Sequence, residues 1–97
     1  MIVITASIRA REGKEDELIS LMQGLVAQVR KNEPGNITYS LHRSKRDRNL
    51  FMVYEKYASP EAMQAHMTSS HFQEASKKMG GVVDGGLGIE TYEVVAE

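Results

Sequence analysis

Two of the chain's three histidines lie five residues apart in the stretch AHMTSSHF, at residues 65–72. An imidazole has an ordinary pKa of about 6.5, so a histidine can take up or release a proton at neutral pH. His66 shares one side of a predicted helix with Met63 and Met67, and its ring is therefore expected to face the interior. There it is either a buried histidine bonded to the backbone or a general base, which makes His66 the candidate catalytic residue.

The other two histidines have weaker claims to a chemical role. His71 directly follows Ser70, which is expected to cap a helix, so its ring lies in the first helical turn. It is either half exposed and helps the helix to begin or, held neutral by the helix N-terminus, contacts a ligand as a donor or base. His42 shares a strand face with Thr38 and Ser40 and is predicted to lie at a dimer interface or in solvent.

The spacing of these residues does not predict a metal site. His66 and His71 are at i and i+5, which a continuous helix does not place side by side, and no acidic residue stands at ligand spacing between them. The chain also has no cysteine, which excludes thiolate zinc sites, iron–sulfur clusters, disulfides and cysteine nucleophiles. We therefore expect no metal.

The periodicity of apolar residues predicts the elements that position these side chains. Alternation predicts strands, and the expected ranges are residues 2–10, 36–44, 50–57 and 88–95. Between the first two strands, an apolar stripe predicts a helix from Lys14 to Lys31, with acidic residues in its first turn and basic residues in its last. The stretch EPG, at residues 33–35, ends this helix.

A second helical region is predicted to be broken in two near residues 68–70. Ser59 caps the first half and is followed by proline, and this half runs to about Met67. Ser70 and Gln73 match a capping box for the second half, which the glycines at 80 and 81 end. The order of elements is thus β-α-β-β-α-β.

This order predicts an α+β fold, the ferredoxin-like plait, with a four-stranded antiparallel sheet and helices on one face. Ninety-seven residues suffice for a single domain, residues 1–97. The other sheet face would meet water in a monomer, so we expect two copies to pack sheet to sheet as a homodimer.

The helix-side space is predicted to form an apolar, aromatic-lined cavity. Tyr39 and Tyr54 are expected to reach it with their hydroxyls, and Met22, Met63, Met67 and Met79 to supply an adaptable lining. Such walls suit a planar, partly polar ligand. The candidate substrate-binding residues are Tyr39, Tyr54, Met63, Met67, His71 and Phe72.

Charge and hydropathy limit the classes of partner. Twelve lysines and arginines against 13 acidic residues give a net charge of −1, with only the stretch RSKRDR clustered, so nucleic acid is not an expected partner. No apolar stretch approaches the roughly 20 residues of a membrane span. The first residues are predicted to form a strand, not a signal peptide, and a cytoplasmic location is expected.

Four stretches in order resemble the antibiotic biosynthesis monooxygenase family along the whole chain: MIVITASIRAREGKEDEL, EPGNITYSLHRS, FMVYEKYASPEAMQAHMTSSHFQ and GIETYEVV. The resemblance implies sheet-to-sheet dimers with a pocket in each protomer between the sheet and the broken helix. It also implies oxygenases that need no metal, flavin or other cofactor and that oxidise quinols or polyketide aromatics.

Other branches of this family have other chemistries. In the haem-degrading branch, as the resemblance aligns it, the iron-binding histidine, a tryptophan and an asparagine correspond here to Ser76, His66, and Ala6 or Ser7. Haem degradation is therefore not predicted, and the chain has no tryptophan. A further branch, similar to a protein that processes the autoinducer-2 signal, rearranges a small phosphorylated sugar-like molecule.

The sequence therefore predicts a cofactor-independent monooxygenase acting on a small aromatic or quinol-type substrate with dioxygen. His66 would remove a proton, and the electron-rich substrate anion would then reduce oxygen. Two alternatives stay open: an isomerase that uses the same base beside a carbonyl, and a dimer that binds a small ligand without turnover.

Overall fold

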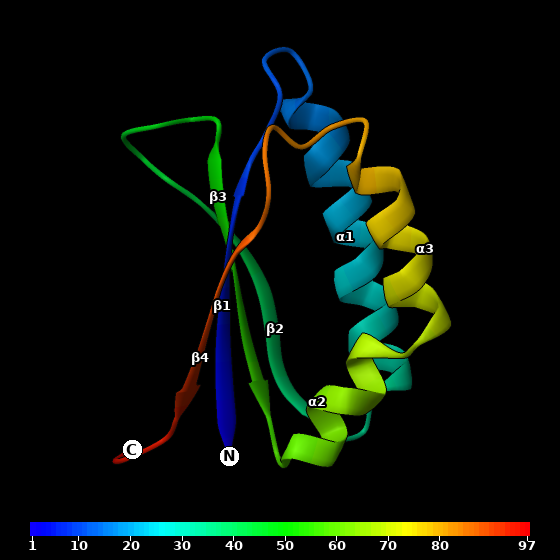
Figure 1. Cartoon of the computed structure of the whole chain (residues 1–97), viewed down its shortest axis with the longest axis vertical. Coiled ribbons are helices and arrows are strands. Elements are labelled where there is room, and N and C mark those ends of the chain that lie inside the picture. Colours follow the sequence, from blue (N-terminus) through cyan, green and yellow to red (C-terminus); the bar gives the residue numbers. More distant parts are fainter.

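The computed structural model describes residues 1–97 as one antiparallel sheet covered by helices on one face (Figure 1). The order of strands in the sheet is β2-β3-β1-β4, so β1 and β3 are central. The elements in chain order are β1 (Ile2–Arg9), α1 (Glu15–Asn32), β2 (Asn36–Arg43), β3 (Leu50–Tyr57), α2 (Pro60–Met67), α3 (Ser70–Met79) and β4 (Gly88–Glu93). The predicted α+β ferredoxin-like fold is confirmed.

Helices α1 and α3 lie side by side along the sheet, and α2 lies across the end of the sheet where β3 finishes (Figure 1). No helix covers the opposite face of the sheet (Figure 1). That face is the one through which the family resemblance implies that two copies pack. None of the helices combines the length and the apolar character that a membrane span needs.

Strand β3 decides which side chains face the helices. Its buried residues alternate with half-buried ones, and the buried set is Phe51, Val53, Glu55 and Tyr57. Tyr54 therefore points to the uncovered face, where it pairs with Thr5 on one side and Ser40 on the other. The expectation that the Tyr54 hydroxyl reaches the helix-side cavity was wrong, because both faces of this strand are apolar enough to be buried.

Helix α1 packs its apolar stripe against the sheet, and the fully buried side chains of this stripe are Leu18, Met22, Leu25 and Val29. Acidic residues in its first turn and basic residues in its last turn complement the helix dipole, as predicted. Burial of these four side chains makes α1 the central support of the core, since each large aliphatic or thioether side chain contributes about 1.5–3 kcal/mol.

The broken helix has a cap at each beginning. Ser59 accepts a hydrogen bond from the Ala62 N–H, and Pro60 occupies the first helical position, as expected. The second cap is Ser69, whose side chain accepts from the Phe72 N–H, and not Ser70. The predicted cap was wrong by one residue, because two adjacent serines both satisfy the sequence preference. The capping box with Gln73 is therefore not formed, and the Gln73 side chain donates to the Met67 carbonyl instead.

Candidate functional site

A cavity of about 450 Å³ lies between the sheet and the broken helix. Most of its lining is apolar, and it includes the four methionines that were predicted to line it. The lining residues that matter for chemistry are Tyr39, Glu55, Met63, His66, Met67 and Phe72. Two of its apolar lining residues, Leu87 just before β4 and Ile89 in β4, are about half exposed.

His66 is the most deeply buried polar residue of the cavity, with 1% of its surface exposed. Its ring lies among three aromatic rings, with centroid distances of 4.7 Å to Phe72, 5.2 Å to Tyr39 and 5.6 Å to Tyr57. The predicted inward orientation is confirmed. Its hydrogen-bond partner is a carboxylate and not, as one of the two sequence hypotheses held, the backbone.

That carboxylate belongs to Glu33, which accepts a 2.9 Å hydrogen bond from His66 Nδ1 at Oε2. Glu33 is the C-cap residue that directly follows α1, and Pro34 after it favours the extended backbone that Glu33 adopts. The Glu33 side chain extends from the end of α1 to the His66 ring on α2. Because a carboxylate oxygen can only accept, the neutral ring must carry its proton on Nδ1, and Nε2 on the other side of that ring then has a lone pair.

Gly35 allows α2 to lie close enough for this bond. A Cβ atom placed on Gly35 would be 2.5 Å from the Cβ of Ala62, which is closer than real side chains come. The Gly35 carbonyl also accepts a hydrogen bond from the Ala58 N–H just before α2 begins. The turn that carries Glu33 is thus held directly against the first turn of the helix that carries His66.

Glu55 is a second buried carboxyl on the cavity wall. Its Oε1 accepts a 2.7 Å hydrogen bond from the Tyr57 hydroxyl and lies 3.9 Å from His66 Nε2. Burial raises the pKa of Glu55, although the hydrogen bond from Tyr57 and the neighbouring His66 oppose the shift. Burial also raises the pKa of Tyr39 far above its ordinary value, so this phenol stays protonated and keeps a proton that it can donate in a hydrogen bond.

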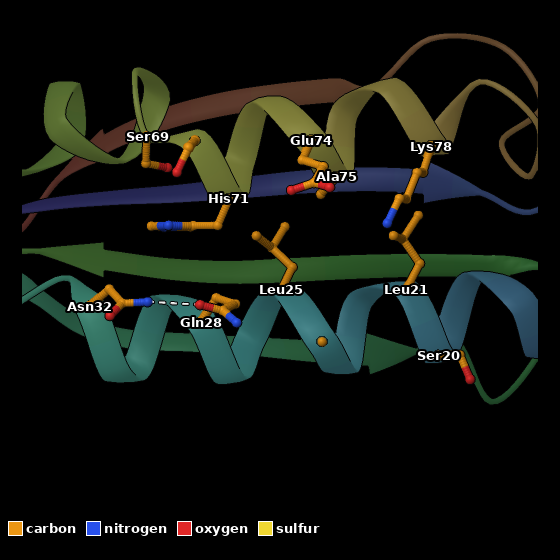
Figure 2. A pocket seen from close by; sticks show the side chains of 12 residues that line it. Ser20, Leu21, Leu25, Gln28, Asn32, Ser69, His71, Glu74, Ala75 and Lys78 are labelled. Carbon is orange, nitrogen blue, oxygen red and sulfur yellow. Dashed lines mark hydrogen bonds between the residues drawn. The ribbon is translucent and has the colours of Figure 1, made fainter.

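His71 is placed differently from the prediction. Its Nε2 donates a 2.5 Å hydrogen bond to the same oxygen of Glu33, so the carboxylate joins two histidines from two helices. His71 does not line the cavity. It lines a polar groove between α1 and α3, as Figure 2 shows, and its assignment as a cavity residue is corrected accordingly.

The third histidine lies away from this site. His42 is exposed on β2, faces away from the helices and shares a 2.8 Å hydrogen bond with Ser40. The cavity therefore brings together Tyr39, Met63, His66, Met67 and Phe72 of the predicted residues. Tyr54, His71 and His42 stand outside it.

The amino-acid sequence matches the model of a known family. The family described as "Antibiotic biosynthesis monooxygenase" matches residues 1–78, a range that contains Glu33, Glu55, His66 and His71. The chain belongs to this family. A relative from Bacillus subtilis (strain 168), YcnE, is named as a candidate monooxygenase and is 37% identical over 73 residues, which cover 75% of this chain and 76% of YcnE.

Solved structures of other proteins share this fold. A candidate antibiotic biosynthesis monooxygenase from Caulobacter crescentus superposes with a TM-score of 0.94 at 33% identity, over 98% of this chain and 90% of that one. The protein PA3566 from Pseudomonas aeruginosa gives a TM-score of 0.89 at 26% identity, over 98% and 94% of the two chains. Family membership thus agrees with both the sequence motifs and the plait.

The site contains two carboxyl groups, of Glu33 and Glu55, that were not predicted from the sequence. Glu33 has no local signal beyond its place in the stretch EPG that ends the first helix. Glu55 had a usable signal, since it is the one charged residue in the alternating set of Phe51, Val53 and Tyr57. A carboxylate at a buried strand position needs partners, and it commonly marks a site.

Proposed function

We propose that this protein is a cofactor-independent monooxygenase that oxidises a small hydroquinone or phenol with dioxygen. The observation that carries the proposal is the hydrogen bond from His66 Nδ1 to Glu33, which leaves the Nε2 lone pair on the cavity side. A neutral imidazole fixed in this tautomer is a general base at neutral pH. The family described above includes relatives named as candidate monooxygenases, which supports the reaction class.

The first step is removal of a phenolic proton by His66 Nε2. The imidazolium that forms is stabilised by Glu33, which already accepts the Nδ1 proton. Tyr39 stays protonated because burial raises its pKa, so its hydroxyl can orient the substrate oxygen as a donor. The aromatic rings of Tyr39 and Phe72 flank His66 and offer flat surfaces to an aromatic substrate.

The substrate anion then supplies the electrons that oxygen needs. It passes one electron to dioxygen, and the two radicals join through a new carbon–oxygen bond to form a peroxide. The proton held by His66 returns to the peroxide, which becomes a hydroperoxide on a ring carbon that still carries its hydrogen. Loss of that hydrogen as a proton forms a carbonyl at this carbon, breaks the oxygen–oxygen bond and releases the outer oxygen as water, which carries both protons away. A hydroquinone and one dioxygen thus give one hydroxyquinone and one water, with the substrate as the only reductant.

The cavity's chemistry favours an uncharged substrate. No lysine or arginine lines the cavity. Its lining contains one carboxyl group, that of Glu55, and one imidazole, that of His66, and these two side chains lie beside each other. The lining thus has no cationic side chain that could bind the phosphate of a phosphorylated, sugar-like molecule. An isomerase acting on such a substrate is therefore not favoured. An apolar wall rich in methionine suits an aromatic ring.

We also propose that the protein acts as a homodimer through the uncovered face of the sheet. That face carries half-buried apolar side chains on its central strands, among them Val3, Leu50, Met52 and Tyr54. A second copy would cover them, as the flat face and the resemblance described above both suggest.

The test is oxygen uptake by EDTA-treated protein with a panel of hydroquinones and phenols. We compare the parent with His66→Ala, and with His42→Ala as a matched control on the opposite face of the sheet. Uptake that falls about a hundredfold or more in His66→Ala and persists in His42→Ala supports the proposal. No uptake with any compound, or equal uptake in the parent and His66→Ala, would refute it and favour the isomerase or ligand-binding alternatives.

A further inference from the structure

The carboxylate of Glu33 brings together two histidines that lie in different helices. Its Oε2 is 2.9 Å from His66 Nδ1 of α2 and 2.5 Å from His71 Nε2 of α3. The ligand atoms of these three residues all lie within 4.8 Å of one another. Three separate elements, the end of α1, α2 and α3, therefore converge on one point in the protein interior.

This point is buried and incompletely paired. The side chains of Glu33, His66 and His71 are 8%, 1% and 15% exposed. The second oxygen of Glu33, Oε1, is buried and has no hydrogen-bond partner. A buried carboxylate oxygen without a partner is unfavourable, and a cation beside it would remove that cost.

We propose that Glu33, His66 and His71 bind one divalent transition-metal ion, of the class of Zn²⁺, Co²⁺ or Ni²⁺. Two imidazoles and one carboxylate are ligands that these ions accept in proteins. Metal–ligand bonds of about 2.0–2.2 Å in a tetrahedral site require ligand atoms about 3.3 Å apart. The two nitrogens therefore need to move away from Glu33 Oε2 by less than about 1 Å, and the free Oε1 is a second available donor.

The groove between α1 and α3 is the route to this site. His71 extends from α3 into the groove, above the end of α1 that carries Asn32 (Figure 2). The other lining residues are mostly polar, whereas the substrate cavity on the other side of His66 is mostly apolar. A hydrated ion would thus reach Glu33 and His71 without passing through the cavity.

Metal binding changes which nitrogen of His66 carries the proton. Coordination needs the Nδ1 lone pair, so the ring proton must sit on Nε2, which lies 3.9 Å from Glu55 Oε1. His71 likewise binds through Nε2 and keeps its proton on Nδ1. In this state His66 cannot accept a substrate proton, so the metal inhibits the monooxygenase; this consequence, unlike the metal binding itself, rests on the function proposed above.

The experiment is a titration of tag-free, EDTA-treated protein with Co²⁺, followed by visible absorption, and with Zn²⁺, followed by calorimetry. We expect one ion per chain and the absorption bands of four- or five-coordinate Co²⁺. His71→Gln should weaken binding more than about tenfold, because it removes a ligand outside the substrate cavity. His42→Gln is the matched control and should bind as the parent does, with folding of each variant checked by circular dichroism.

A second readout follows the tautomer directly. The ¹⁵N chemical shifts of the His66 ring should show a proton on Nδ1 before Zn²⁺ is added and on Nε2 afterwards. Absence of stoichiometric binding, equal affinity in the parent and His71→Gln, or loss of binding in His42→Gln would each overturn the proposal. These measurements need no substrate, so their failure is distinguishable from failure of the oxygen-uptake test.

Discussion

Glu33 and His66 are 33 residues apart in the sequence, yet Glu33 Oε2 and His66 Nδ1 are joined by a 2.9 Å hydrogen bond in the protein interior. The bond determines the tautomer of the one histidine that lines the cavity. Glu33 does not line the cavity itself, so it acts through His66 as a positioning residue. The chemistry of the site thus depends on a residue at the end of α1.

Replacing Glu33 by glutamine should reduce the fraction of His66 that is in the tautomer able to act as the base. The amide can turn its NH₂ group toward His66 Nδ1, in which case the ring proton moves to Nε2 and the cavity-side lone pair is lost. We expect the rate of oxygen uptake to fall about a hundredfold, with a smaller change in KM. The ¹⁵N shifts of the metal-free His66 ring should report the changed tautomer.

Glu74→Gln is the control for this prediction, because Glu74 is an exposed glutamate on α3 that lines the same groove as His71. It should leave both the uptake rate and the His66 shifts unchanged. A Glu33→Gln variant with the parent's rate and tautomer would contradict the role assigned to Glu33.

Gly35→Ala should destabilise the protein by separating α2 from the turn that carries Glu33. The new Cβ atom would be 2.5 Å from the Cβ of Ala62, and neither atom can rotate away. We expect a loss of about 1–3 kcal/mol in the free energy of unfolding, measured by urea denaturation.

Gly24→Ala is a matched control, for which we expect the free energy of unfolding to change in the opposite direction. Gly24 lies within α1, and a Cβ atom there would meet no other atom within 4 Å. Alanine should therefore stabilise the helix by about 0.5–1 kcal/mol. If both variants shifted stability in the same direction and by the same amount, the close contact between Gly35 and Ala62 would not be the cause.

Glu55 makes stability depend on pH in a defined direction. Burial raises its pKa in the folded protein above the value of the unfolded chain. Its contribution to stability is thus fully present below the unfolded pKa and is lost as pH rises through the folded pKa. Glu55→Gln keeps an acceptor for the Tyr57 hydroxyl and has no charge to bury, so it should be more stable than the parent at neutral pH.

The measurement is the melting temperature in EDTA-containing buffers from acidic to neutral pH. The advantage of Glu55→Gln over the parent should grow as pH rises and be smallest at the acidic end. Glu12→Gln, which changes an exposed carboxyl in the loop after β1, should follow the parent at every pH. If the stability advantage of Glu55→Gln were largest at acidic pH, burial would not be the dominant influence on the pKa of Glu55.

The sequence was sufficient to predict the fold because each element has a clear period. The strand at Leu50–Tyr57 was predicted with its observed bounds, and the inward face of the helix carrying His66 was also correct. Local ambiguity explains the errors. Adjacent serines left the cap of α3 uncertain by one residue, and a strand apolar on both sides placed Tyr54 on the wrong face.

The site was less predictable than the fold for a physical reason. His66 has a local signal, its helical spacing from methionines, but Glu33 becomes its partner only through tertiary packing. That packing depends on Pro34, which bends the chain out of α1, and on Gly35, which lets α2 approach. No periodicity in a single sequence reports a contact between residues so far apart.

The uncovered sheet face leads to the last prediction, which concerns assembly. Met52 lies on this face in the first half of β3, a central strand of the sheet, opposite Ser7 of β1 and His42 of β2. If a second copy covers the face, Met52→Glu puts a carboxylate into the interface, and the cost of removing this charge from water should separate the dimer. Light scattering should then give a mass near twice 10.8 kDa for the parent and near 10.8 kDa for the variant.

Gln23→Glu is the control for added charge, because Gln23 is exposed on α1, on the covered side of the sheet. It should keep the dimer. A parent that is monomeric at its highest soluble concentration would refute the dimer outright. A Met52→Glu variant that stays dimeric and folded would place the contact elsewhere, since burying a glutamate in a sheet-to-sheet interface removes its charge from water.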